Sequence, residues 1–101
     1  MDVLVKGHKY LLDNFEHIED YGQELQFIHK EKVGDDLMTL TDGTTNEEVL
    51  WVLIDRMNHL QKQFPCQENL SSINHMKEAL RWLNKRTEYR NKRGVEGKHE
   101  K

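Results

Sequence analysis

The stretch covering residues 64–97 constrains the fold more than any other part of this 101-residue chain. It contains Pro65 near its start, and no further glycine or proline occurs before Gly94. Proline suits the first turn of a helix or the loop before it, because its φ is fixed and it has no N–H. Lys92 and Arg93 place cations near the expected helix end, and glycine tolerates the left-handed conformation that often follows one. The pattern predicts one long helix from near Pro65 to near Gly94.

This helix is expected to have distinct faces. About 27 residues would span about 40 Å, which is too long for one small partner element to cover, so we expect it to reach a second copy of the chain. One seam of apolar side chains recurs at helical spacing and is the expected core face. Its members are Ile73, Met76, Leu80 and Leu83. A separate line of cations, expected to be solvated, consists of Lys77, Arg81 and Lys85.

A second stripe beside the seam consists of Arg86, Arg90 and Arg93. Cations on a helix surface are most often solvated, and that is the simplest interpretation of these three. This stripe, however, borders apolar surface that includes Trp82. Guanidinium groups in such surroundings can hold phosphate through two hydrogen bonds and can stack on bases. The stripe is therefore a candidate phosphate-binding site.

The charge distribution favours a small anionic ligand over a long nucleic-acid track. The net charge is −3, with 6 Lys or Arg against 14 Asp or Glu in residues 1–75 and 9 against 4 in residues 76–101. A nucleic-acid track usually needs a larger basic surface. The hydrophobic content of 36% is low for a chain of this size, so association of several copies would help to bury a core.

The N-terminal part of the chain is predicted to be β-rich. Residues 8–16 and 24–31 have the composition of strands and flank a turn segment, so the two most simply pair as a hairpin. Residues 37–40 form a candidate third strand. Residues 1–7 have no strong pattern and are either a frayed end or an edge strand.

A first helix is predicted over residues 46–62. Thr45 and Glu48 match a capping box, in which the hydroxyl group accepts from the third helical N–H and the carboxylate reaches back. Trp51 is expected in the core rather than at an interface. The short break before the next helix requires the two helices to fold back on each other as an antiparallel hairpin.

The predicted fold is α+β, a small N-terminal antiparallel β-sheet followed by an antiparallel two-helix hairpin, in an oligomer. The chain is interpreted as one domain, residues 1–101. Residues 1–44 are its β-rich part, residues 45–94 its helical hairpin and residues 95–101 its tail.

Neither a catalytic centre nor a metal or cofactor site is predicted. No glycine-rich phosphate loop precedes a helix, the six histidines lack metal-ligand spacing, and Cys66 is the single cysteine. No carboxylate pair stands out as an acid and a base in apolar surroundings. No signal peptide or membrane-spanning run is recognised, so a cytosolic protein without a membrane partner is expected.

Residues 40–101 resemble the phage anti-Thoeris proteins of the first-described Tad family and related helical-hairpin sponge proteins of phages. The resemblance rests on several short motifs in order. They are Gly-Thr-Thr-Asn-Glu-Glu at 43–48, Cys-x-Glu-Asn at 66–69, Glu-Ala-Leu-x-Trp-Leu at 78–83, Lys-Arg-Thr at 85–87, Arg90, and Gly-Val-Glu-Gly at 94–97.

The resemblance implies a non-enzymatic protein of the host cytoplasm that binds the immune signal glycocyclic ADP-ribose without breaking it. It also implies binding of cyclic di- or trinucleotides of CBASS-type signalling in some members, and assembly into dimers and hexamers with pockets between protomers. Asn69, Arg86 and Arg90 fall on ligand-binding positions, with polar recognition by the amide and phosphate neutralisation by the arginines. Leu60 stands where the family has a base-stacking aromatic residue, and Phe64 is the alternative.

Helix geometry bears on where such a ligand could bind. Asn69 and Arg86 are 17 positions apart, which is about 25 Å along one helix, so they cannot hold one small ligand from the same chain. Antiparallel packing of two copies would bring Asn69 of one towards Arg86 and Arg90 of the other. Two other functions remain open: a small nucleic-acid-binding regulator that uses the basic helix end, and an enzyme that degrades the signal.

Overall fold

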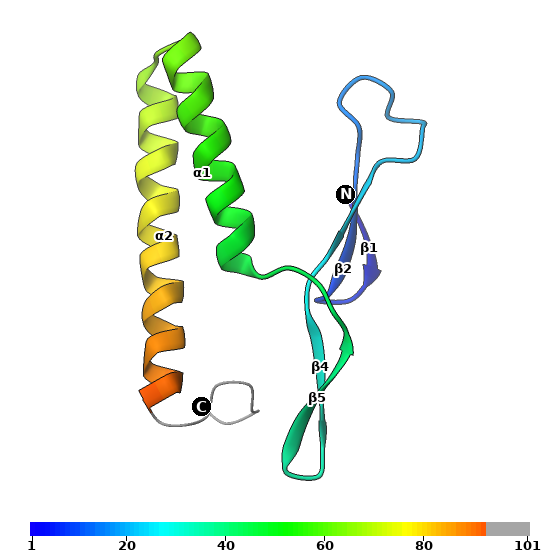
Figure 1. Ribbon diagram of the computed structural model, residues 1–101. Coiled ribbons are helices and arrows are strands. Elements are labelled where there is room, and N and C mark those ends of the chain that lie inside the picture. The colour runs from blue at the N-terminus through cyan, green and yellow to red at the C-terminus, as the bar shows by residue number, and fades with distance from the viewer. Residues whose placement is uncertain (93–101) are drawn as a thin grey trace. The chain divides into compact units, whose positions relative to one another are not determined.

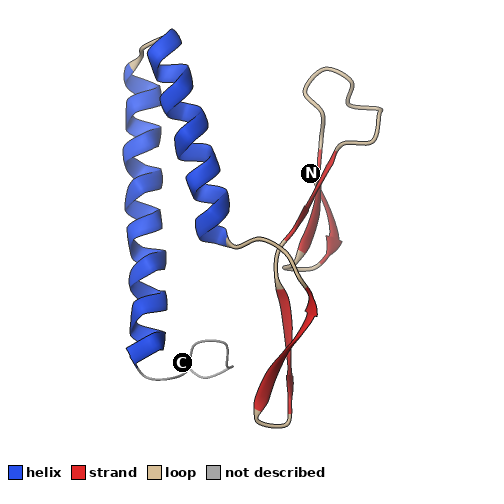
Figure 2. Cartoon of the chain, in the orientation of Figure 1, coloured by secondary structure: helices blue, strands red, loops and turns tan. Residues whose placement is uncertain are grey.

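The computed structural model describes residues 1–92, so Arg93, the expected helix end at Gly94 and the tail of residues 95–101 lie outside the described residues. The chain has two compact units, Met1–Thr45 and a second unit that begins at Asn46. The first is made of strands and the second of helices (Figures 1 and 2). The chain is therefore α+β, as predicted.

The first unit contains two antiparallel sheets rather than the single sheet predicted. The strands are β1 (Asp2–Val5), β2 (Lys9–Leu12), β3 (Gln23–Gln26), β4 (His29–Val33) and β5 (Asp36–Thr41). β1, β2 and β3 form one sheet in that order, and β4 pairs with β5 in the other. The predicted hairpin is confirmed for β2 and β3, in which Tyr10 lies opposite Leu25. The first residues form an edge strand, one of the two alternatives.

The prediction of one continuous strand over residues 24–31 is wrong, because the backbone changes its hydrogen-bond partners after β3. Phe27 N donates to His8 O at 2.7 Å, whereas Ile28 N donates to Thr44 O at 2.9 Å. Gly43 permits this close approach, since a Cβ there would lie 2.5 Å from Gln26 O. β4 therefore starts a new sheet, and the predicted third strand belongs to β5 in that sheet.

The second unit consists of α1 (Asn46–Gln63) and α2 (Gln67–Lys92), which lie side by side in Figure 1. α1 begins at Asn46 as predicted from the capping pattern. α2 begins after Pro65, which lies in the loop, and Cys66 caps the helix because its Sγ accepts from Asn69 N at 3.4 Å. Neither described helix combines the length and hydropathy needed to cross a membrane.

The core of the second unit is thin. Among the described residues, the buried hydrophobic side chains are Ile54 of α1 and Ile73 and Leu80 of α2. Ile73 and Leu80 belong to the predicted seam, which is thereby confirmed as the core face. Trp51 is 55% exposed, so its expected core position is wrong for the isolated chain. Two helices can cover only one stripe of each other, and the remaining apolar side chains stay in contact with solvent.

Candidate functional site

The predicted ligand-binding residues fall into two groups at different ends of α2. Leu60 lies near the end of α1, and Phe64 in the loop after it leads to Asn69 in the first turn of α2. Arg86 and Arg90 lie near the other end of α2. Because α2 is one continuous helix, Asn69 and Arg86 are about 25 Å apart along its axis. One chain therefore does not bring the two groups together.

The first group is held in place by hydrogen bonds of the interhelical loop. Asn69 Nδ2 donates to Phe64 O at 3.4 Å, and Phe64 N donates to Leu60 O at 2.8 Å. The Phe64 side chain is 74% exposed, whereas Leu60 is half-buried. Within residues 1–92, no donor reaches Asn69 Oδ1, so this oxygen can accept a hydrogen bond from a ligand. The loop thus presents an aromatic ring beside a positioned amide.

The second group consists of two guanidinium groups near the end of the described part of α2. In the described part of the chain, neither Arg86 nor Arg90 makes a hydrogen bond or an ion pair. The sequence explains why, because no acidic residue lies three or four positions from either of them. Arg81, by contrast, donates to Glu78 at 2.6 Å. Arg86 and Arg90 can therefore bind an anion without first breaking an ion pair.

A hollow of about 430 Å³ lies on α2 and is lined by Trp82, Lys85, Arg86 and Tyr89. These four residues occupy positions i, i+3, i+4 and i+7 of the helix, so they share one face. Lys85 was expected to belong to a solvated line, but it is half-buried in this wall. The hollow therefore combines two aromatic rings with two cations.

Glu78 holds Trp82 and Arg81 at the edge of this surface. Its Oε1 accepts from Trp82 Nε1 at 3.0 Å and from Arg81 Nη2 at 2.6 Å. The Arg81 guanidinium lies 4.9 Å and the Lys85 ammonium 5.5 Å from the centroid of the Trp82 ring. The hydrogen bond from Arg81 is the main reason that the pKa of Glu78 is lowered from its usual 4.5. Partial desolvation of the carboxylate acts in the opposite direction and raises the pKa. Trp82 thus depends on an ionised carboxylate for its position.

The orientation of Trp82 should consequently be lost only in acid. The pKa of Glu78 in the folded protein is below 4.5. The stabilisation that its ionised carboxylate gives is therefore fully present above pH 4.5 and is lost as the pH falls through the lowered pKa. We expect the emission of Trp82, measured in a Trp51→Phe background, to stay constant between about pH 8 and pH 5 and to shift below pH 4.5. Glu78→Gln should remove this transition. A midpoint above 4.5, or an unchanged transition in the glutamine variant, would contradict the assignment.

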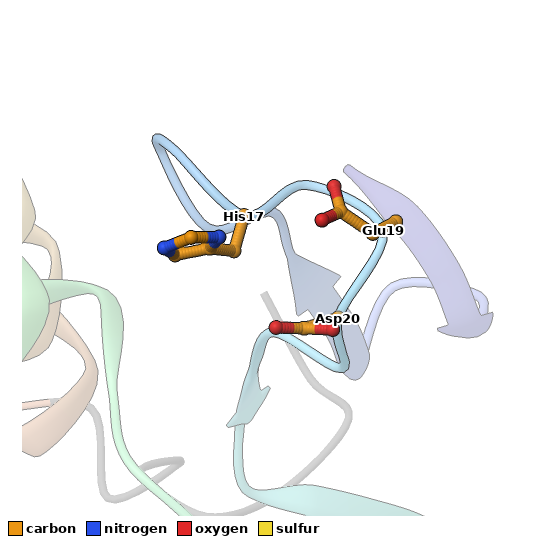
Figure 3. Close-up of side chains that lie close together, drawn as sticks. All are labelled: His17, Glu19 and Asp20. Carbon is orange, nitrogen blue, oxygen red and sulfur yellow. The ribbon is translucent and has the colours of Figure 1, made fainter.

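A cluster of potential metal ligands lies elsewhere, in the loop between β2 and β3 (Figure 3). One ligand atom each from His17, Glu19 and Asp20 lies within 4.8 Å of the other two, and all three residues are exposed. A histidine that binds a metal usually has its second ring nitrogen oriented by a partner. Within residues 1–92 the three side chains make no hydrogen bond that would orient them. We assign no metal function to this cluster.

Comparison with known proteins gives one informative similarity. The sequence is 48% identical over 61 residues to Thoeris anti-defense 1 of Bacillus phage SBSphiJ7. The matched segment covers 59% of this chain and 43% of the phage protein, so the chain spans less than half of that relative's length. No protein-family profile matches the sequence. The similarity is therefore to a phage protein that is named for its action against Thoeris defence, over part of each chain.

Sequence reasoning named the arginines as candidates and did not predict the hollow. Trp82 was recognised only as a neighbour of the arginine stripe, and Tyr89 was not considered. The signal that could have found them is the spacing of two aromatic residues seven positions apart with two cations between them. Counting acidic neighbours at helical spacing would also have separated Arg86 and Arg90, which have no ion pair within residues 1–92, from Arg81, which is paired with Glu78.

Proposed function

We propose that this protein inhibits Thoeris defence by binding a cyclic nucleotide immune signal in the host cytoplasm and sequestering it without degradation. The proposed signals are glycocyclic ADP-ribose and cyclic oligonucleotides, the latter including signals of CBASS-type systems. The observation that carries the proposal is the pair of guanidinium groups of Arg86 and Arg90, which have no hydrogen-bond or ion-pair partner among residues 1–92. Such groups bind phosphate through charge-assisted hydrogen bonds.

The absence of buried polar groups supports binding without chemistry. Among residues 1–92, no polar or charged side chain is buried. Acid and base catalysts usually depend on desolvation or a close charge partner that shifts their pKa towards neutrality. Sequestration needs only tight binding by preorganised groups. We therefore propose that the protein is not an enzyme.

We further propose that the binding pocket is shared between two copies, each with its helices in an antiparallel hairpin, within a dimer that assembles into a hexamer. In a two-fold dimer, Asn69 of one copy would face Arg86 and Arg90 of the other, which restores the proximity that a single chain lacks. The thin core supports association, because large apolar side chains of the second unit remain exposed. Those outside the hollow are Trp51, Val52, Leu53, Phe64 and Leu70.

The test is calorimetric titration of the purified protein with glycocyclic ADP-ribose and with a panel of cyclic di- and trinucleotides. The ligand is then released by heating and identified by chromatography. We expect tight binding of at least one compound and its recovery intact. A chemically changed product would indicate an enzyme, and no binding by the folded protein to any compound would reject the proposal.

The alternative is a small nucleic-acid-binding regulator that uses the basic end of α2. The same titration with polynucleotides separates the two functions, because contacts with many phosphates give an affinity that falls steeply with salt. We expect weak and strongly salt-dependent polynucleotide binding. Tight binding of RNA or DNA together with no binding of cyclic nucleotides would favour the regulator.

A further inference from the structure

The hollow on α2 has the composition of a site for a base attached to a phosphate. Trp82 and Tyr89 are 56% and 54% exposed, so they leave aromatic surface in contact with solvent. Lys85 and Arg86 lie between them in the sequence and line the same wall. Bases stack on exposed aromatic rings, and cations beside the rings neutralise the phosphate. The volume of about 430 Å³ also lies within the range typical of small-molecule sites.

The two aromatic rings differ in how firmly they are held. The Trp82 ring is fixed by its hydrogen bond to Glu78 and by the guanidinium group of Arg81. Within the described residues, the Tyr89 ring makes no ring contact or hydrogen bond. The Trp82 ring is therefore already oriented before a ligand binds, whereas the Tyr89 ring can adjust to a ligand. Lys85 is a flexible cation that can leave the Trp82 ring and reach a phosphate.

These rings do not belong to the core of the second unit. The face formed by Trp82, Lys85, Arg86 and Tyr89 is offset from the seam that contains the buried Ile73 and Leu80. Ile73 and Leu80 are 2% and 5% exposed, about a tenth or less of the exposed fraction of Trp82. The two aromatic residues are thus not needed to fill the space between α1 and α2.

We infer that Trp82 and Tyr89 form a base-stacking surface for a nucleotide whose phosphate is held by Lys85 and Arg86. The inference rests on the proposed function, because Arg86 is common to both, and it adds the residues that recognise the base. The aromatic side chains that recognise the base then lie on α2 itself. The site therefore selects ligands that carry both a base and a phosphate.

The test compares a cyclic dinucleotide, cyclic di-GMP, with inorganic pyrophosphate, which has charge but no base. Both are titrated against Trp82→Leu and Tyr89→Leu, with Trp82→Phe and Tyr89→Phe as variants that keep a ring. Phe15→Leu is the matched control, because Phe15 is 97% exposed but belongs to the first unit, outside the hollow. Each leucine variant in the hollow should weaken cyclic dinucleotide binding about 5- to 150-fold.

Pyrophosphate affinity should stay unchanged in the leucine variants, and the two phenylalanine variants should retain most of the nucleotide affinity. Equal losses for both probes would overturn the inference, as would a wild-type affinity for cyclic di-GMP in both leucine variants. If both Trp82→Leu and Trp82→Phe dissociate the assembly, a second copy covers the hollow. That result would also overturn the inference. A wild-type protein that binds no member of the nucleotide panel rejects the proposed function itself, which is a distinguishable result.

Discussion

Replacing Arg90 by alanine should abolish nucleotide capture and leave the protein folded and assembled. Arg90 is half-buried near the end of α2 and has no acidic partner among the described residues, so its removal leaves no carboxylate unpaired. Loss of a charge-assisted, bidentate hydrogen bond to phosphate reduces the binding free energy by about 2–5 kcal/mol. This corresponds to an affinity that is lower by about 30- to 5,000-fold. Calorimetry with the tightest ligand of the panel measures the loss.

Lys77→Ala is the matched control for this variant. Lys77 lies on the same helix and carries the same charge, but it is exposed and stands 13 positions from Arg90, which is about 20 Å along the helix. We expect Lys77→Ala to change the affinity by less than about threefold, because distant exposed charges are screened. Arg90→Lys should give an intermediate loss, since lysine keeps the charge but not the planar guanidinium group. Equal losses in the Lys77 and Arg90 variants would mean that net charge alone attracts the ligand.

The helices of this protein were predictable because their boundaries depend on local chemistry. α1 begins at Asn46, where Thr45 and Glu48 match a capping box, and α2 is described over Gln67–Lys92, a stretch without glycine or proline. The buried positions of Ile73 and Leu80 follow from the helical period alone. In these elements the same residues determine both the local conformation and the face that packs.

The strands were less predictable because their partners are chosen by the tertiary structure. Residues 24–31 alternate in polarity and resemble one strand, yet the backbone around Phe27 bonds first to His8 and then to Thr44. Nothing in the local pattern shows that Gly43 will bring a distant segment so close. Composition therefore predicted strands in the right region and the wrong number of sheets.

The candidate site was predictable in its charges and not in its shape. Arg86 and Arg90 stand out in the sequence because they lie at helical spacing beside an apolar face. The exposure of Trp82 and Tyr89 depends on which residues α1 covers, and that is a property of the packed pair of helices. The Lys85 ammonium lies 5.5 Å from the centroid of the Trp82 ring, and the sequence does not specify this geometry.

A mixture of two inactive variants should recover binding if each pocket takes residues from two copies. Asn69→Ala and Arg90→Ala are each expected to bind no ligand alone, since one lacks the amide and the other the guanidinium group. In a two-fold dimer of one Asn69→Ala chain with one Arg90→Ala chain, one pocket loses both groups and the other keeps both. Differently tagged chains, refolded together and purified through both tags, should therefore bind about half as much ligand as the wild type.

Mixing Arg86→Ala with Arg90→Ala is the control that decides the interpretation. Both arginines approach the pocket from the same chain, because they lie one turn apart on α2. Every pocket of that mixed dimer then lacks one arginine, so binding should not recover. Recovery in the first mixture alone requires Asn69 and Arg90 to meet across an interface. If neither mixture recovers binding while both remain assembled, Asn69 and Arg90 do not complete one pocket across the interface, and the proposal of a shared pocket is rejected.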